Sequence, residues 1–530
     1  MLAATQVLFA PTALAQGYVP ISGSGSTWSF NALDQWRRNV ENLNGIRVNF
    51  SPSGSSQGRT EFRAGTVDFA VSEIEYGLTD GGVRDFPPDN RGFAYMPIVA
   101  GGTAFMYNLK IGNNRVTNLR LSGEVITKIF SKQITNWSDP AIKADNPGLT
   151  LPARPIVPVV RSDGSGTTAQ FTRWMAAKHG GIWDSYCGRP NCGFTSNFPV
   201  KSGVEAKSGS QGVAGFVAQA SSEGAITYVE YSYARNAKFP VAKMLNGAGY
   251  YVEPKAPSVA VALTEAQIRD DLTQELGGVY NNGDRRTYPL SSYSYMILPT
   301  DNRPNFNEQK GRTLADFAYY FLCEGQQQAE ALGYSPLPIN LVQAGVKQVA
   351  RIPGTTNKLN ETNLRGCNNP TFSPDGENLL AKTAPQPEEC DKQGPTQCAT
   401  GTGGALATTQ NNAGGNNAGG NTAGNTAGNT AGNTGGGNTG GNNADGNNTG
   451  GTTAAIDPET GAPLIDPETG ELVNADSAAA ASGASAIPVS VDLPDDRQRR
   501  LLAVLAVILL VALVLGPPLV SRNLSQRGKS

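Results

Sequence analysis

Residues 161–168, Arg161-Ser162-Asp163-Gly164-Ser165-Gly166-Thr167-Thr168, decide the fold class of this 530-residue chain. They follow the apolar, strand-like run 155–160 and lead into the helix-like run 169–175. A turn of small residues between a strand and a helix presents free backbone N–H groups and the positive end of the helix dipole. Hydroxyls and the guanidinium of Arg161 add further donors. The segment predicts an oxyanion site, and the alternative is a polar loop whose Ser or Thr caps the helix.

The same pattern of strand, small-residue loop and helix occurs twice near the N-terminus. Residues 19–40 and 48–64 each show it, and the strand-like run 66–72 ends at Glu73. Four polar strand ends, three of which open helices, predict parallel α/β sheets with a ligand at the carboxyl edges of the strands. Each one alone has an alternative, an ordinary Gly/Ser turn. Their recurrence favours a binding site.

Two apolar, β-rich segments predict where the chain crosses between two lobes. These are residues 95–109 and 288–298. Two crossings divide the body into two lobes with a hinge between them. Helices are expected over 121–130 and 314–332.

Composition indicates an exported protein without a nucleic-acid partner. The net charge is −2, so no global basic field attracts nucleic acid. Charged residues are few, and Gly, Asn, Ser and Thr are abundant. Residues 1–16 are mainly apolar and contain Ala13-Leu14-Ala15, which predicts a signal-peptide-like segment although the basic residues usual at its start are missing.

The number of cysteines also indicates an exported protein. Six cysteines in an exported chain predict three disulfides. The expected pairs are Cys187–Cys192, Cys323–Cys367 and Cys390–Cys398. No Cys-x-x-Cys spacing occurs and His179 is the only histidine, so neither a metal site nor a cofactor is expected.

The C-terminal part of the chain predicts a tether to a membrane. Residues 355–402 are loop-rich and hold three cysteines, which indicates a stapled extension packed on the body. Residues 403–494 are largely Gly/Asn/Thr/Ala low complexity, and such a coil has an r.m.s. reach of about 50 Å. An apolar run predicts a transmembrane helix at 499–520, and with the signal-like start it places the body outside the plasma membrane and the tail 521–530 in the cytoplasm.

Over about residues 18–354 the chain resembles the phosphate-binding proteins of phosphate ABC transporters, the PstS family. The order and approximate spacing of its motifs are similar to those of that family. The motifs are Gly23-Ser24-Gly25-Ser26-Thr27-Trp28, Gly54-Ser55-Ser56-Gln57-Gly58, Val67-Asp68-Phe69-Ala70-Val71-Ser72-Glu73 and residues 161–167, with further likeness at 121–140 and 332–338.

The resemblance implies a type 2 periplasmic-binding-protein fold, an α/β architecture of two lobes that close on one oxyanion. Lobe 1 would hold about 17–100 and 299–354, and lobe 2 about 101–298. It also implies a set of phosphate ligands: backbone N–H groups of Thr27, Trp28, Ser55, Ser165, Gly166 and Thr167, hydroxyls of Thr27, Ser55, Ser165 and Thr167, and the guanidinium of Arg161. Asp163 would orient Arg161, and Ser26 would support the site.

Glu73 departs from the pattern, because the family usually has Asp there. Phosphate near neutral pH carries a proton and sulfate does not, so a buried carboxylate accepts a hydrogen bond from one anion and repels the other. Glu keeps the charge but is one methylene longer. Either it repositions and does the same work, or it points elsewhere and the selectivity changes.

The leading hypothesis is therefore a monomeric, membrane-tethered, extracytoplasmic protein that captures inorganic phosphate and delivers it to the permease subunits of an ABC transporter. It would not be an enzyme, since a phosphatase or phosphotransferase needs a metal cluster, an activated nucleophile or a phosphate-accepting His. The alternative is a surface adhesion or sensor protein that keeps the oxyanion-binding fold without transport. The long tether and membrane helix favour that alternative.

Overall fold

The computed structural model describes residues 17–356, 364, 367, 369–373 and 376–405, all within one compact unit, Met1–Gly419. The signal-like segment, the predicted membrane helix and tail, and all of the predicted tether except 403–405 lie outside the described residues. Among the residues that are described, no helix combines the length and apolar content needed to cross a bilayer.

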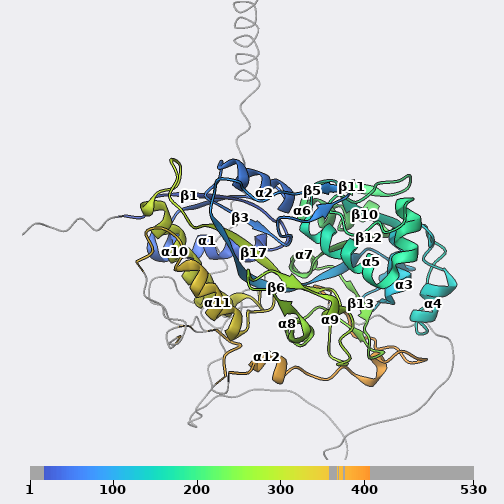
Figure 1. Ribbon diagram of the computed structural model, residues 1–530. Helices are drawn as coiled ribbons and strands as arrows, with labels where there is room; N and C mark the ends of the chain where they lie inside the picture. Colours follow the sequence, from blue (N-terminus) through green and yellow to red (C-terminus); the bar gives the residue numbers. More distant parts are fainter. Residues whose placement is uncertain (1–16, 357–363, 365–366, 368, 374–375, 406–530) are drawn as a thin grey trace, which may run out of the picture. The chain divides into compact units, whose positions relative to one another are not determined.

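An 11-stranded mixed sheet forms the centre of the unit (Figure 1). Eight strands follow one path, and three more lie beside it, with β13 pairing to β6, β9 and β14. In spatial order the path is β11 (Glu205–Lys207), β10 (Val157–Arg161), β12 (Ala225–Glu230), β6 (Phe93–Tyr107), β17 (Ser291–Pro299), β3 (Phe69–Ser72), β1 (Ile21–Gly25) and β2 (Val48–Ser51); the others are β9 (Arg120–Leu121), β13 (Val241–Leu245) and β14 (Tyr251–Val252).

Strand β6 joins two parallel parts of this sheet. Its residues 93–102 pair antiparallel with β17, and residues 103–107 pair antiparallel with β12. Strands β2, β1 and β3 are parallel to one another, and so are β11, β10 and β12. We call these the first and second half-sheets. The mixed α/β fold is thus confirmed, and both predicted crossing segments are long strands at the junction; the exact lobe boundaries stay predictions.

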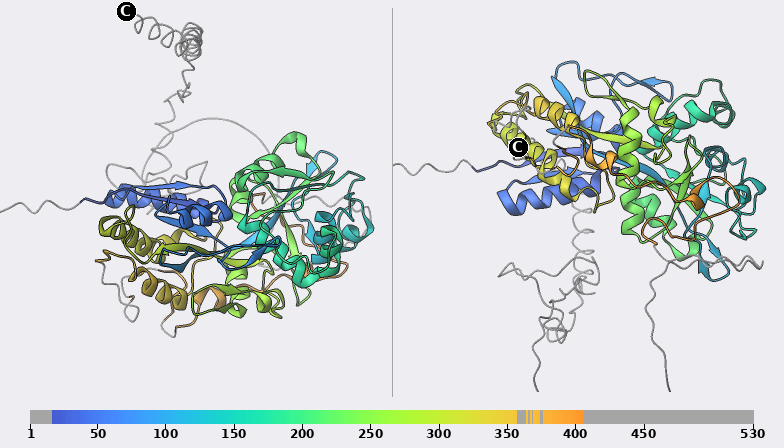
Figure 2. Two further views of the ribbon diagram at one scale, coloured as in Figure 1. Left: turned by 45° about the horizontal axis from the view of Figure 1, so that its top comes forward. Right: turned by 90° about the horizontal axis from the view of Figure 1, so that it is seen from below.

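Helices follow the parallel strands, as the sequence pattern predicts. Figure 2 shows the N-terminal segments in blue beside the yellow helices α10 and α11, with the cyan and green helices around the second half-sheet. The helices are α1 (Phe30–Asn44), α2 (Ser55–Ala64), α3 (Gly123–Phe130), α4 (Pro140–Asp145), α5 (Gly166–Cys187), α6 (Gly209–Val217), α7 (Tyr231–Asn236), α8 (Ala256–Ala262), α9 (Gly277–Tyr280), α10 (Glu308–Leu322), α11 (Ile339–Val349) and α12 (Leu379–Lys382). Three two-stranded hairpins complete the set: β4–β5 (Thr79–Asp80, Val83–Arg84), β7–β8 (Lys110–Ile111, Asn114–Arg115) and β15–β16 (Gln267–Ile268, Gln274–Glu275).

One predicted helix is too long. The pattern over 314–332 predicts a single helix, whereas α10 ends at Leu322 and a 3-10 turn follows at Glu324–Gln328. The residue between them, Cys323, has a non-helical backbone (φ −115°, ψ −91°) and forms a disulfide with Cys367. The bonded cysteine therefore sits where the apolar period alone would have continued the helix.

All three predicted disulfides are present: Cys187–Cys192, Cys323–Cys367 and Cys390–Cys398. The described part of the extension packs closely on the body. The buried ammonium of Lys243 in β13 bonds both carboxylate oxygens of Asp391, at 2.7 and 2.6 Å. The hydroxyl of Thr371 donates to the carbonyl of Leu337 at 2.7 Å. The extension is thus attached near both halves of the sheet.

Candidate functional site

The loop after β1 is fixed by a close approach between neighbouring strands. Gly25 has φ 135°, and a Cβ there would lie 2.1 Å from the carbonyl oxygen of Val71, so only glycine fits. The amide of Ser26 donates to the same carbonyl at 2.8 Å. The chain then turns through Thr27 and Trp28, both buried, at the carboxyl end of the first half-sheet. This is the edge where parallel α/β sheets bind ligands.

Glu73, at the end of β3, points into the same space. Its side chain is fully buried and accepts three hydrogen bonds from hydroxyls: Ser26 at 2.6 Å and Ser294 at 2.7 Å to Oε1, and Ser55 at 2.8 Å to Oε2. A Cβ added to Gly166 would lie 2.0 Å from Oε2, so the carboxylate touches the loop of the second half-sheet. Of the two alternatives raised by the longer side chain, the geometry is the one in which Glu73 faces the predicted ligand groups.

Compared with a carboxyl group in water, Glu73 is shifted toward its protonated form. Burial raises the pKa of this carboxyl above its ordinary value, and the hydrogen bonds from Ser26, Ser294 and Ser55 oppose part of that rise. The three donors also fix the direction of the carboxylate, because each hydroxyl comes from a different element. Glu73 is consequently a pre-oriented hydrogen-bond acceptor in a water-poor site.

Arg161, at the end of β10, supplies the positive charge. It is 2% exposed, and its guanidinium forms a bidentate pair with Asp163 through Nε and Nη2. Burial would raise the pKa of Asp163, but the bonds and charge of Arg161 outweigh it and leave that pKa lowered. Asp163 also accepts the amide N–H of Gly209 at 2.9 Å. The predicted orienting role of Asp163 therefore has a geometric basis, since both ends of the carboxylate are held.

Helix α5 begins inside the site. The hydroxyl of Ser165 caps it by accepting the amide of Thr168 at 3.2 Å, and Gly166 donates its amide to the Ser55 hydroxyl at 3.1 Å. The hydroxyl of Thr167 is buried and has no hydrogen-bond partner among the described residues. An orphaned buried hydroxyl is costly unless a ligand or water pairs with it. Thr167 is thus the clearest single sign that this loop faces a polar ligand.

The predicted donors largely pair with one another in this conformation. Trp28 donates its amide to the Ser26 hydroxyl at 2.9 Å, while the hydroxyls of Thr27 and Ser210 lie 2.8 Å apart. Backbone of the two half-sheets also meets directly, because the amide of Ser56 donates to the carbonyl of Gly164 at 3.2 Å. The loops therefore form one enclosed polar cluster rather than two separate surfaces.

Two site residues were not anticipated. Ser210, in the first turn of α6, is fully buried and accepts a hydrogen bond from Arg161 Nη1 at 3.3 Å. The run Ser208-Gly209-Ser210-Gln211-Gly212 is another small-residue turn before a helix, so the pattern used elsewhere would have found it. Ser294 lies within β17 and carries no such signal, because only the strand pairing brings it to Glu73.

The arrangement can hold an anion between the donors of the two half-sheets. Ser165 and Ser55 have no histidine, lysine or cysteine within the hydrogen bonds they make. His179 packs against Trp174, with ring centroids 5.0 Å apart, away from these hydroxyls. Among the described residues the only cluster of metal-ligating types is Glu388, Cys390 and Cys398, and its two thiols are joined as a disulfide.

A family model and two relatives compared by sequence agree on one family. Residues 10–324 match the model of the PBP superfamily domain. The phosphate-binding protein PstS of Xylella fastidiosa is 33% identical over 336 residues, which cover 63% of this chain and 85% of that protein. The protein of the same name from Pasteurella multocida is 30% identical over 339 residues, covering 64% and 92%. A solved phosphate-binding protein of Stenotrophomonas maltophilia aligns at a TM-score of 0.47 with 19% identity, over 66% of this chain and 98% of the other.

Proposed function

The chain belongs to the PBP superfamily and within it to the PstS family of phosphate-binding proteins, and from that premise we propose that it binds inorganic phosphate between its two half-sheets and delivers it to a phosphate ABC transporter. The protein would act outside the cytoplasmic membrane, with the permease subunits of the transporter as partners. The predicted C-terminal helix would hold it at the membrane, body outside.

One observation carries the proposal: a buried acceptor, Glu73, lies among donors. The serine hydroxyls, the amides of Trp28 and Gly166 and the charge of Arg161 suit an anion with several oxygens. A carboxylate in the same cluster is of use only if the anion also brings a proton to share. Phosphate near neutral pH has such a proton, and sulfate lacks it.

The expected selectivity follows from what happens to an unpaired acceptor. Sulfate would place its oxygens against the Glu73 carboxylate with no hydrogen between them, in a site from which water is excluded. Sites built to pair with a ligand OH reject an analogue lacking it by about 10⁴ or more. The three serine donors on Glu73 support this role, because they keep the carboxylate in place for the ligand.

A tethered sensor or adhesion protein is the second candidate. The low-complexity run 403–451 and the apolar run 501–515 favour this candidate. Together they are typical of a domain attached to a membrane by a long flexible linker rather than of a freely diffusing carrier. Both candidates bind the anion. Growth at limiting phosphate after deletion of the gene separates them, because only loss of a transport component slows growth under that limitation.

Titration calorimetry of the full chain tests the binding claim. Phosphate and sulfate are titrated separately at neutral pH, and we expect tight binding of phosphate and no heat from sulfate. Arg161→Ala should abolish high-affinity binding, whereas Arg154→Ala should not, because Arg154 forms a half-exposed ion pair with Glu223 outside the site. Sub-micromolar phosphate binding by the Arg161→Ala variant would contradict the site assignment.

A further inference from the structure

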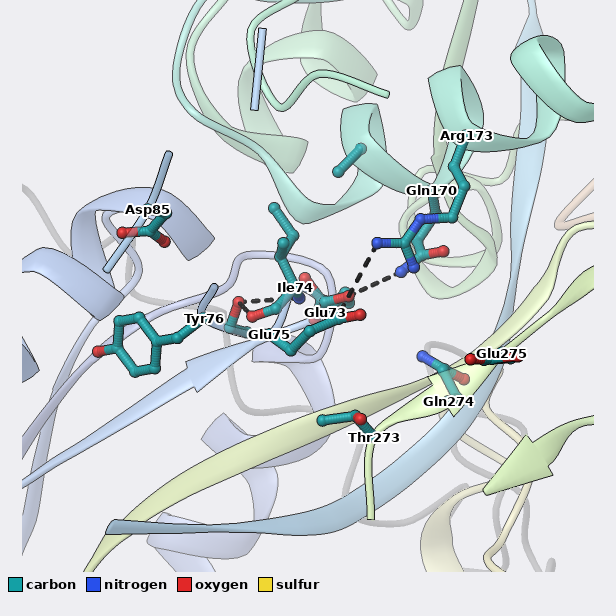
Figure 3. Close-up of polar contacts among 12 residues, drawn as sticks. Glu73, Ile74, Glu75, Tyr76, Asp85, Gln170, Arg173, Thr273, Gln274 and Glu275 are labelled. Carbon is teal, nitrogen blue, oxygen red and sulfur yellow. Dashed lines mark hydrogen bonds and ion pairs between the residues drawn. The ribbon is translucent and has the colours of Figure 1, made fainter. Parts of the chain in front are cut away.

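One face of α5 connects the ligand loop to the far side of Glu73. Gly166 is the first residue of the helix, and Gln170 and Arg173 follow at positions four and seven residues later. Residues with these spacings lie on one side of a helix. Figure 3 shows Gln170 and Arg173 reaching from α5 toward the segment of Glu73 and Glu75. The helix that opens at the predicted ligand therefore also contacts the segment that carries the acceptor.

Two contacts join this face to the segment. The side-chain amide of Gln170, a buried residue, donates to the backbone carbonyl of Glu73 at 2.7 Å. The guanidinium of Arg173 lies 3.6 Å from Glu75 Oε2, and that of Arg269 lies 3.3 Å from Glu75 Oε1. Helix α5 follows β10 of the second half-sheet, whereas Glu73 and Glu75 follow β3 of the first. Both contacts therefore bridge the two half-sheets.

Of the two cations around Glu75, only Arg173 belongs to the second half-sheet. Arg269 lies in the turn of the β15–β16 hairpin, and Gln274 of the same hairpin bonds the backbone of Tyr293 in both directions, at 2.9 Å each. Tyr293 is part of β17, which pairs with β3. Separation of the half-sheets would thus leave Arg269 beside Glu75 and remove Arg173.

The loss of Arg173 would leave Oε2 of Glu75 without its cation, because Arg269 bonds the other oxygen, Oε1, at 3.3 Å. The Glu75 side chain is 8% exposed, and its Oε2 has no hydrogen bond among the described residues. A buried carboxylate oxygen without hydrogen bonds depends on a nearby cation. Arg173 is itself held in place over the ring of Phe194, 5.0 Å from its centroid.

We propose that Gln170 and Arg173 are positioning residues that fasten the Glu73–Glu75 segment to α5 and so slow the release of the bound anion. The inference rests on the proposed function, since it concerns release of phosphate from that same site. Gln170 fixes the backbone of the acceptor residue, and the ion pair of Arg173 with Glu75 must break before the half-sheets separate. Neither residue belongs to the predicted ligand set: Gln170 acts on Glu73, which does, and Arg173 acts on Glu75, two residues further along the same segment.

Release of radiolabelled phosphate from the full chain into excess unlabelled phosphate tests the proposal. Arg173→Gln and Glu75→Gln should each speed release roughly 5- to 20-fold, the lower part of the range usual for coupling between sites. The double variant should be no faster than either single one, because both remove the same pair. Association rates should stay unchanged. Arg154→Gln is the matched control, since its partner Glu223 lies near the same half-sheet, and it should leave release unaltered.

Hydrogen exchange of the phosphate-free full chain gives a readout that needs no ligand. Arg173→Glu places like charges together, so we expect faster exchange in peptides covering 53–58 and 161–168, and no change in Arg154→Glu. Unchanged release in both single variants, or effects of the two that simply add, would overturn the proposal. If the wild type fails to bind phosphate, the proposed function is wrong and the exchange experiment alone decides whether the two half-sheets are fastened here.

Discussion

The replacement of Glu73 by Gln separates the acceptor role of this residue from its shape. Glutamine keeps the length of the side chain and removes its charge. The amide oxygen still accepts from Ser26 and Ser294, and the amide nitrogen donates to the hydroxyl of Ser55. Ser55 accepts from Gly166 as well, so its own proton becomes available to the ligand.

The magnitude follows from the number of unpaired groups. In the wild type, sulfate meets a carboxylate with no proton between them, and we expect discrimination of about 10⁴ or more, about 5.5 kcal/mol. In Glu73→Gln the second N–H of the amide can donate to sulfate or to an unprotonated oxygen of phosphate, because the amide oxygen is already shared by Ser26 and Ser294. Phosphate affinity should fall about tenfold, because a hydrogen bond between neutral and charged partners is rearranged and the charged acceptor for the phosphate OH is lost. The preference for phosphate over sulfate should then drop to within about tenfold.

Competition titrations of the two anions at pH 8 on the full chain measure this ratio. The thermal midpoint should stay equal or rise, because burial raises the pKa of Glu73 and the folded state thus disfavours its charge at pH 8. Glu75→Gln is the control: it lies two residues on, is also buried, and should weaken both anions alike without changing the ratio. A Glu73→Gln protein that folds and still rejects sulfate by 10⁴ would show that the discrimination arises elsewhere.

Three further predictions concern charge, pH and the disulfide framework. Because protonated Glu73 can donate to sulfate, wild-type sulfate affinity should rise as pH falls through its raised pKa, and a profile that stays flat from pH 8 down to the ordinary carboxyl value of 4.5 would contradict this role. Asp163→Asn leaves Arg161 buried without its counterion and should cost about 3 kcal/mol in denaturant unfolding; phosphate should then stabilise the variant more than the wild type. The lowered pKa of Asp163 means that its contribution is present above the ordinary carboxyl value and is lost as pH falls through the folded-state value, so the difference between the two proteins should shrink in acid. Replacing Cys323 and Cys367 by Ala should lower the free energy of unfolding by up to about 4 kcal/mol, because the disulfide closes a loop with a sequence separation of 44. A loss under about 1 kcal/mol in calorimetric unfolding would refute the loop-closure explanation.

Local patterns were sufficient to predict most of the architecture. The turns after β1, β2 and β10 follow from small residues between an apolar run and a helical period, which is a property of a few neighbouring residues. The ends of elements were less predictable. Leu322 ends α10 because Cys323 must reach Cys367, 44 residues away, and no local period contains that information.

The site residues also fall into two groups, those with a local sequence signal and those without one. Thr27, Ser55, Arg161 and Thr167 lie in or directly beside turns of small residues, which are visible in the sequence. Ser294 lies in the middle of a buried strand and meets Glu73 only because β17 pairs with β3. Residues brought together by pairing across the sheet carry no local signal, and these are the ones that a single sequence leaves out.

The hydrogen bonds that the site residues make with one another determine which anions can replace them. Ser26 and Ser55 each accept a backbone amide and donate to Glu73, so both serines stand between the acceptor and two of the predicted donors. An anion that takes these amides must replace both links. A protonated oxyanion can do so with little net change in hydrogen bonding, because its oxygens accept the amides while its OH donates to Glu73. An oxyanion without a proton satisfies the amides but places a negative charge beside Glu73 with no hydrogen bond between them. Its entry would break the bonds of the two serines to the amides without replacing them by an equivalent set, and is therefore unfavourable.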